Sequence, residues 1–172
     1  MRIPIAVAAV VLSLTGIAEG QVASDKYLLL ATERTATMQQ EIDDAAARGF
    51  RVFGASPNDG SEAVFLLEQT QERYQYRLLA ATRSGTLQKE INEAADDGYR
   101  IVPRAVSRKG DELLVLMEKR SADSAKAQYR LLATERTGTL QKEISSAARD
   151  GYALIALAKT GEHIAILERD DP

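Results

Sequence analysis

The sequence predicts an α+β protein built from three tandem copies of one β-α-β-β unit. One stretch recurs three times along the 172-residue chain, beginning at Tyr27, Tyr76 and Tyr129. In each copy apolar residues recur at helical spacing, and short apolar runs of strand length lie on both sides of them. Each unit has about fifty residues, a size at which an isolated core is marginal. We therefore expect the units to pack on one another.

Each unit is expected to open with a short strand at 27–31, 76–80 or 129–133. Tyrosine, leucine and alanine recur on one face of this strand, which predicts that this face is buried. The other face carries Leu28, Arg77 or Arg130 followed by a leucine, and is expected to be partly buried.

A helix should follow the first strand. Thr37, Thr86 and Thr139 are predicted N-caps, because a threonine hydroxyl accepts hydrogen bonds from the first turn. Glycine followed by an aromatic residue is expected to end each helix. In the three copies the apolar stripe of the helix consists of Met38, Ile42, Ala45 and Ala46; Leu87, Ile91, Ala94 and Ala95; and Leu140, Ile144, Ala147 and Ala148. The predicted helix ends are Gly49, Gly98 and Gly151.

Two more strands complete the unit. The second is expected at 50–55, 99–105 and 152–158, and Pro103 places it at a sheet edge because proline cannot donate to a ladder. The third strand is an uninterrupted apolar run at 63–67, 113–117 and 164–167, which predicts cover on both faces.

The helix returns the chain, so the first two strands should run parallel, with the third between them and antiparallel to both. This gives a small mixed sheet of order 1-3-2 with one helix on one face, half of a ferredoxin-like layout. We expect the three sheets to pack on each other with helices outward, around a pseudo-threefold axis; beads on a string is the alternative.

The first twenty residues are predicted to be a signal peptide rather than part of the fold. Arg2 precedes an apolar run at 3–14, and small residues precede a cleavage site expected at Gly20–Gln21. An uncleaved membrane anchor is the alternative, although the run is shorter than the roughly 20 residues of a spanning helix. A cleavable signal peptide predicts a periplasmic or secreted protein. The three repeats are expected at 21–70, 71–120 and 121–172. The absence of cysteine excludes disulfides and lipoprotein acylation.

Composition excludes several function classes. The net charge is −3 with both signs interspersed, so no basic stripe predicts a nucleic-acid partner. With one histidine and no cysteine, a zinc site is not expected. Nothing matches a P-loop or a dinucleotide fingerprint, and no cofactor is predicted. The Asn58–Ser61 stretch lacks the alternating acidic ligands of a calcium loop, and a turn is expected there.

Four polar positions at and just before the helical segment recur in all units. One is the predicted threonine cap, and the other three form the candidate site. One interpretation is structural, since glutamate suits the first turns of a helix and arginine can pair with it or cap neighbouring carbonyls. The other is a binding site for a small anionic or amide-bearing ligand near the helix N-termini. The candidate residues are Arg34, Arg83, Arg136, Gln39, Gln88, Gln141, Glu41, Glu90 and Glu143.

His163 is the only histidine, and Ala63 and Leu113 occupy its place in the other units. A triad is recognised by geometry, so a Ser-His-Asp arrangement remains open. No serine lies in a nucleophile-elbow context, however. A histidine at the start of a strand is the simpler interpretation.

The helix of each unit ends in a Gly-aromatic step, as in Gly98–Tyr99 and Gly151–Tyr152, and the last strand closes on Glu118–Lys119 or Glu168–Arg169. In these features the unit resembles small bacterial domains of unknown function whose helix ends in a Gly-Trp or Gly-Tyr step. Those domains occur singly, whereas here the unit is tripled. The resemblance implies no activity.

Three functional hypotheses follow. The leading one is a non-catalytic binding or structural repeat protein of the cell envelope. The second is an extracytoplasmic hydrolase that uses His163 with carboxylates. The third is an inhibitor or chaperone-like partner of an envelope protein, acting through the variable turns between the second and third strands of each unit; it predicts that these turns cluster on one exposed surface.

Overall fold

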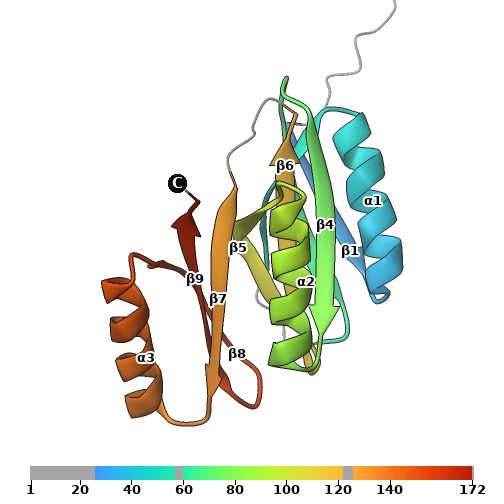
Figure 1. Cartoon of the computed structure of the whole chain (residues 1–172). Helices are drawn as coiled ribbons and strands as arrows, with labels where there is room; N and C mark the ends of the chain where they lie inside the picture. Colours follow the sequence, from blue (N-terminus) through green and yellow to red (C-terminus); the bar gives the residue numbers. More distant parts are fainter. Residues whose placement is uncertain (1–25, 57–59, 122–125, 172) are drawn as a thin grey trace, which may run out of the picture.

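The structure is a computed structural model that describes residues 26–56, 60–121 and 126–171. It confirms the α+β class and the three β-α-β-β units, which follow one another across Figure 1 from the blue N-terminal unit to the red C-terminal unit. The expected signal peptide lies outside the described residues, as do Asn58 and Asp59 of the predicted Asn58–Ser61 turn. No helix of the described ranges is long and apolar enough to cross a membrane.

The three units have the same element order. The first contains β1 (Tyr27–Thr32), α1 (Thr35–Ala47), β2 (Phe50–Ala55) and β3 (Ala63–Gln69). The second contains β4 (Tyr74–Ala81), α2 (Ser84–Asp96), β5 (Arg100–Lys109) and β6 (Glu112–Arg120). The third contains β7 (Ala127–Thr134), α3 (Thr137–Arg149), β8 (Ala153–Lys159) and β9 (His163–Asp170).

Each unit forms its own three-stranded sheet, with strand orders β1-β3-β2, β4-β6-β5 and β7-β9-β8. The predicted 1-3-2 order is therefore confirmed. The first and second strands run parallel but are separated by the third, so every ladder is antiparallel. Tyr27, Tyr76 and Tyr129 pair with Glu68, Glu118 and Glu168 in the same register. Because the pairing is the same in each sheet, residues at corresponding positions of the three units can be compared directly.

The helices begin earlier than predicted. Arg34, Arg83 and Arg136 are the extended N-cap residues, and none forms a side-chain capping bond. Each arginine carbonyl instead accepts the first helical hydrogen bond, from Met38, Leu87 or Leu140, at 3.0–3.1 Å. The residues predicted to be caps are instead the third residues of their helices: Thr37, Thr86 and Thr139. The capping prediction was wrong because the backbone already turns helical two residues before each threonine.

The helix C-termini end as predicted. Gly49, Gly98 and Gly151 have φ between 87° and 89°, a left-handed conformation that glycine adopts without penalty. In the second unit, Gly98 N–H donates to the Ala95 carbonyl and Tyr99 N–H donates to the Ala94 carbonyl. These two bonds form a Schellman motif, which satisfies carbonyls left free at the helix end.

The second strand of each unit is an edge strand with an irregularity. The register shifts between Val52 and Gly54, between Ile101 and Val106, and between Leu154 and Ala156. Pro103 lies within the shift in β5, where its missing N–H breaks no regular ladder. The predicted edge position of this strand is confirmed.

The stacking of the units differs from the expected arrangement. Helices α1 and α2 do not face outward; α1 packs on β4 of the second unit and α2 packs on β7 of the third. One core thus contains Met38 and Ile42 from α1 with Leu114 and Leu116 from the second sheet. Within the described ranges each unit packs mainly on the next one, and the first does not pack extensively on the third. The result is an open stack of alternating sheets and helices, not a closed threefold arrangement.

On one side of the stack the sheets touch directly, since β2 packs on β5 and β5 packs on β8. Gly54 makes this approach possible, because a Cβ there would lie 2.9 Å from the Arg104 carbonyl oxygen. Each sheet therefore converges with the next along the second strands and opens around the inserted helix along the first strands.

The position of a sheet in the stack determines how its central strand is covered. The apolar residues of β6 and β9 are buried on both faces, as predicted. In β3 burial alternates, and Val64 and Leu66 remain half-buried. Their equivalents in the second sheet are Leu114 and Leu116, which are fully buried. Within residues 26–56, 60–121 and 126–171, no helix packs on the outer face of the first sheet, and Val64 and Leu66 of that face stay half-buried.

The helix-ending glycines provide a test of the fold. We expect Gly98→Ala to lower the free energy of unfolding by roughly 1–2 kcal/mol, because alanine is strained at positive φ. Gly85→Ala is the matched control: Gly85 lies in the first turn of α2 with open space around it, so the change should be neutral or stabilising by up to about 1 kcal/mol. Urea unfolding of both variants measures this, and equal effects would contradict the assignment.

Candidate functional site

The recurring glutamines bind the backbone of the following unit. Gln39 Nε2 donates to the Tyr76 carbonyl at 3.2 Å, and Leu78 N–H donates to Gln39 Oε1 at 2.7 Å. Gln88 makes the same pair of bonds one unit later, to the Tyr129 carbonyl at 3.1 Å and from Leu131 N–H at 2.6 Å. We call this paired arrangement the glutamine clamp.

The clamp acts on strands that have a free edge. β4 and β7 are the first strands of their sheets, and each is bonded to a neighbouring strand on one side only. The outward N–H and C=O groups of such an edge can template pairing with another chain. The primary amide of glutamine has both a donor and an acceptor, so one side chain satisfies both backbone groups.

In the part of the chain that the structure describes, the third copy of the glutamine faces no strand of another unit. Gln141 is exposed on α3, and Gln141 Nε2 lies 3.2 Å from Ser145 Oγ on the same helix. At the other end of the stack, β1 has the equivalent edge at Tyr27 and Leu29, and no described strand pairs with it there. The repeated glutamine is therefore engaged in two units and available in the third.

The arginine and glutamate members of the candidate site lie elsewhere. Arg34, Arg83 and Arg136 are exposed at the helix starts. The predicted arginine–glutamate ion pair does not occur within the described ranges. Glu41 and Glu90 are half-buried and Glu143 is exposed. Because a sheet separates each helix from the next, the three sets are not gathered into one site, and ligand binding by them stays a prediction.

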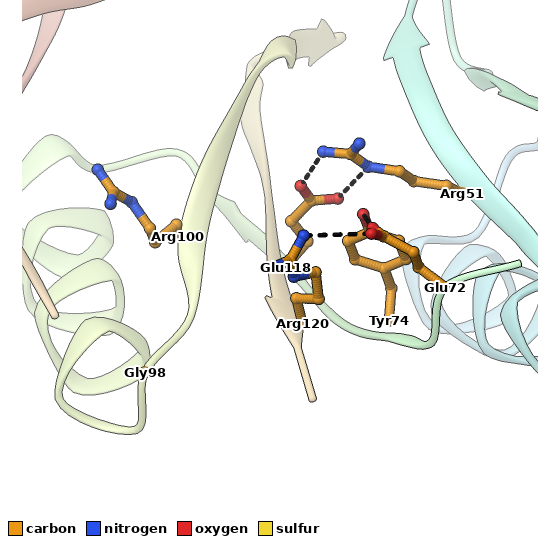
Figure 2. A pocket seen from close by; sticks show the side chains of 7 residues that line it. All are labelled: Arg51, Glu72, Tyr74, Gly98, Arg100, Glu118 and Arg120. Atoms are coloured by element: carbon orange, nitrogen blue, oxygen red, sulfur yellow. Dashed lines mark hydrogen bonds and ion pairs between the residues drawn. The ribbon is translucent and has the colours of Figure 1, made fainter. Parts of the chain in front are cut away.

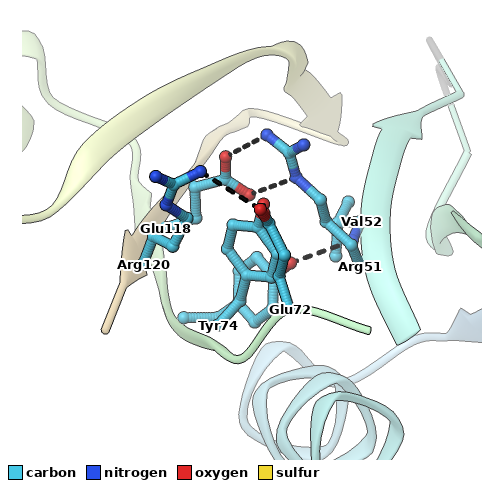
Figure 3. Close-up of polar contacts among 7 residues, drawn as sticks. Arg51, Val52, Glu72, Tyr74, Glu118 and Arg120 are labelled. Atoms are coloured by element: carbon cyan, nitrogen blue, oxygen red, sulfur yellow. Dashed lines mark hydrogen bonds and ion pairs between the residues drawn. The ribbon is translucent and has the colours of Figure 1, made fainter. Parts of the chain in front are cut away.

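A second contact between units involves residues that the sequence analysis missed. Arg51 of β2 reaches Glu118 of β6 through two bonds, with Nη2–Oε1 at 2.6 Å and Nε–Oε2 at 3.2 Å (Figure 3). Val52 N–H donates to the Tyr76 hydroxyl at 3.0 Å. The Arg51 guanidinium also lies 4.6 Å from the centre of the Tyr74 ring. The bidentate geometry raises the pKa of Arg51, chiefly through its hydrogen bond to Glu118.

The same contact recurs between the second and third units. Arg100 pairs with Glu168 and, at 2.8 Å, with Asp170. Ile101 N–H donates to the Tyr129 hydroxyl at 3.0 Å, and that hydroxyl donates to Glu168 at 2.6 Å. The position of Arg51 and Arg100 is occupied by Ala153 in the third unit. An arginine retained only in units that precede another unit was the signal that could have revealed this contact.

A charged cleft of about 370 Å³ lies beside the first of these contacts (Figure 2). Within it Arg51 pairs with Glu118, and Arg120 pairs with Glu72 at 3.2 Å. A hydrogen bond from the Tyr74 hydroxyl lowers the pKa of Glu72. Arg100 points away from this group in Figure 2, toward the third unit. The charges of the cleft are therefore largely neutralised by one another, which makes it a poor anion site.

His163 begins β9 and is half-buried, with Thr134 and Lys159 opposite it on the two neighbouring strands. Its equivalents Ala63 and Leu113 belong to the buried cores. Across the described ranges no group of three His, Asp or Glu side chains could hold a metal ion. We see no nucleophile or carboxylate bonded to His163 in the same ranges, so nothing there favours a triad.

No family model, curated protein or solved structure matches this chain.

The glutamine clamp makes a direct prediction about stability. Gln39→Ala and Gln88→Ala each remove two hydrogen bonds between units, so each should lower the free energy of unfolding by roughly 1–2 kcal/mol. Gln141→Ala is the matched control, because its side chain is exposed and clamps no strand; it should change stability by no more than about 0.5 kcal/mol. Thermal or urea unfolding at low protein concentration distinguishes them, and a Gln141→Ala loss as large as the others would contradict the clamp.

The buried tyrosines predict a pH dependence. Burial raises the pKa of Tyr76 and of Tyr129 above the ordinary value near 10. Both side chains are neutral below pH 10 in either state, and above it the unfolded chain ionises first, so stability falls. The Tyr76→Phe, Tyr129→Phe double variant should be less stable at pH 8 but lose about 1 kcal/mol less per tyrosine between pH 8 and pH 11.

The measurement is urea unfolding at a series of pH values. Tyr27→Phe serves as the exposed control, since this ring is 51% exposed. Parallel slopes for the wild type and the double variant would refute the assignment.

Proposed function

We propose that this protein is a non-catalytic structural and binding module that acts outside the cytoplasm, as a repeat scaffold of the cell envelope. One observation carries the proposal: the polar side chains that recur at both contacts between units, a glutamine and an arginine, hold the stack together instead of converging on a reaction centre. Gln39 and Gln88 bind backbone of the next unit, and Arg51 and Arg100 pair with carboxylates of the next unit.

The exposed parts of the stack support the same proposal. The charged cleft has its carboxylates already paired with arginine. Such paired groups lack the free base or acid that general acid–base catalysis requires. A stack of repeats instead offers extended surfaces suited to binding other macromolecules.

The catalytic alternative is tested with chromogenic ester, phosphoester, glycoside and peptide substrates. We expect the purified protein and its His163→Ala variant to give the same rates, equal to those of buffer. Turnover by the wild-type protein that His163→Ala abolishes, while the fold is retained by circular dichroism, would overturn the proposal in favour of a hydrolase.

The envelope location is tested by expressing the full chain in a Gram-negative host and fractionating the cells. The product should appear in the periplasm or the medium with Gln21 as its first residue, because the leader has the features of a cleavable signal. Retention of Met1 in the cytoplasmic fraction would contradict this part of the proposal.

A second candidate, an inhibitor or chaperone-like partner of an envelope protein, is favoured by the turns. Gly110 N–H donates to the Gly60 carbonyl at 3.1 Å, and Arg108 donates to the Lys159 carbonyl at 2.9 Å. The ends of the three turns therefore lie near one another, which supports this candidate. Replacing residues 110–111 and 160–161 by Asn-Gly should abolish co-purification of an envelope protein without loss of stability; an unchanged set of bound proteins would exclude this candidate.

A further inference from the structure

Each end of the stack exposes the same kind of surface that is buried at the interfaces between units. At one end, the head, β1 and the outer face of the first sheet expose Tyr27 and Leu29, with Val64, Leu66 and Glu68 beside them. At the other end, the tail, α3 and β8 expose Gln141, Ala148 and Leu154, with Ile144 half-buried. Each inner interface joins a tail-type surface to a head-type surface.

We propose that the head of one copy of this chain docks on the tail of a second copy and repeats the inner interface. Gln141 would then clamp the Tyr27 carbonyl and the Leu29 N–H of the next copy, as Gln39 clamps Tyr76 and Leu78. The Tyr27 hydroxyl would accept from Leu154 N–H, as the Tyr76 hydroxyl accepts from Val52 N–H.

Exposure at the head supports this partner. Tyr27 is 51% exposed, whereas its equivalents Tyr76 and Tyr129 are 4% and 5% exposed. Leu29 is 64% exposed, and the equivalent Leu78 is packed against the first core. The end of the stack thus retains the aromatic and aliphatic residues that the inner interfaces bury.

Exposure at the tail follows the same pattern. Ala46 and Ala95 are buried at 8% and 3% against the following unit, whereas Ala148 is exposed. Leu154 is 44% exposed, and its equivalents Val52 and Ile101 are buried. Soluble repeat arrays ordinarily carry polar residues on the outer faces of their terminal units. Among the described residues, the head instead exposes Tyr27 and Leu29, and the tail exposes Ala148 and Leu154.

One residue makes the interface between copies weaker than the inner ones. Ala153 stands where Arg51 and Arg100 form ion pairs with the next unit. Glu68 of the docked copy would therefore lack the arginine that Glu118 and Glu168 have. Head-to-tail contacts of this type are heterologous, so they extend into open chains of copies unless a ring closes.

Association of copies would give the proposed scaffold its partner, and only the biological purpose of that association rests on the proposed function. Its test is the state of association in solution. That result is independent of the substrate assays and of the cellular location.

Two exposed substitutions block one end each. Leu29→Glu blocks the head and Ala148→Glu blocks the tail, and neither position is buried in the single chain. Sedimentation velocity from about 10 µM to about 1 mM covers association free energies typical of weak interfaces. We expect the wild type to form species that grow with concentration, each variant to stay monomeric, and an equimolar mixture of the variants to form a dimer and nothing larger.

The mixture decides between modes of association, because Leu29→Glu retains a free tail and Ala148→Glu retains a free head. A monomeric wild type at every concentration would overturn the proposal, as would a mixture that forms no dimer or a variant that still self-associates. Unchanged circular dichroism and melting temperature confirm that both variants are folded.

A gain-of-association variant provides the converse test. Ala153→Arg restores the guanidinium of the inner interfaces opposite Glu68 of the next copy, so the dissociation constant should fall about tenfold. Adding Glu68→Ala to Ala153→Arg should reverse this gain. An Ala153→Arg protein that associates no more tightly than the wild type would place the contact elsewhere and overturn the proposed geometry.

Discussion

The free edge of the first strand is the constraint on which this architecture depends. A three-stranded sheet has two edges, and the outward backbone groups of β4 and β7 need partners that their own sheets do not supply. The preceding helix provides them through Gln39 and Gln88. The two hydrogen bonds of each glutamine hold its helix against the following sheet. They thereby determine both the order and the direction of the stack.

The burial of apolar surface follows from the same placement. A helix between two sheets contacts apolar side chains on both of its sides, which a unit of about fifty residues cannot achieve alone. Met38 and Ile42 are fully buried for this reason, in a core that includes Leu114 of the next unit. Ile144 of the third unit packs on its own sheet in the part of the chain that the structure describes, and it is only half-buried. Stability is therefore shared between neighbouring units.

Local features of the fold were predictable because their causes lie within a few residues. Gly98 followed by Tyr99 indicates a helix end, and Pro103 indicates an edge strand, from backbone chemistry alone. The error at Thr86 is also local: threonine suits an N-cap, but the chain turns helical at Ser84, and the Arg83 carbonyl closes the first turn. Propensity located the helix correctly but misplaced its start.

Contacts between units were harder to predict. Gln39 was identified as a recurring polar residue, yet its partner in β4 depends on how the units stack, and local patterns contain no such information. Arg51 was missed because only positions shared by all three units were considered, and Ala153 breaks that pattern. Residues that serve an interface recur only in units that have a following neighbour, so an incomplete recurrence can be more informative than a complete one.

Because each inner interface joins the same two kinds of surface, the stack has no intrinsic length. Removal of the middle unit would bring Gln39 to the edge of β7 and Arg51 to Glu168, which are the partners that Gln88 and Arg100 have now. A gene for such a chain can gain or lose a whole unit by recombination between its own copies without creating an unmatched surface. Lineages that carry this architecture can therefore differ in repeat number while the contacts between repeats stay the same.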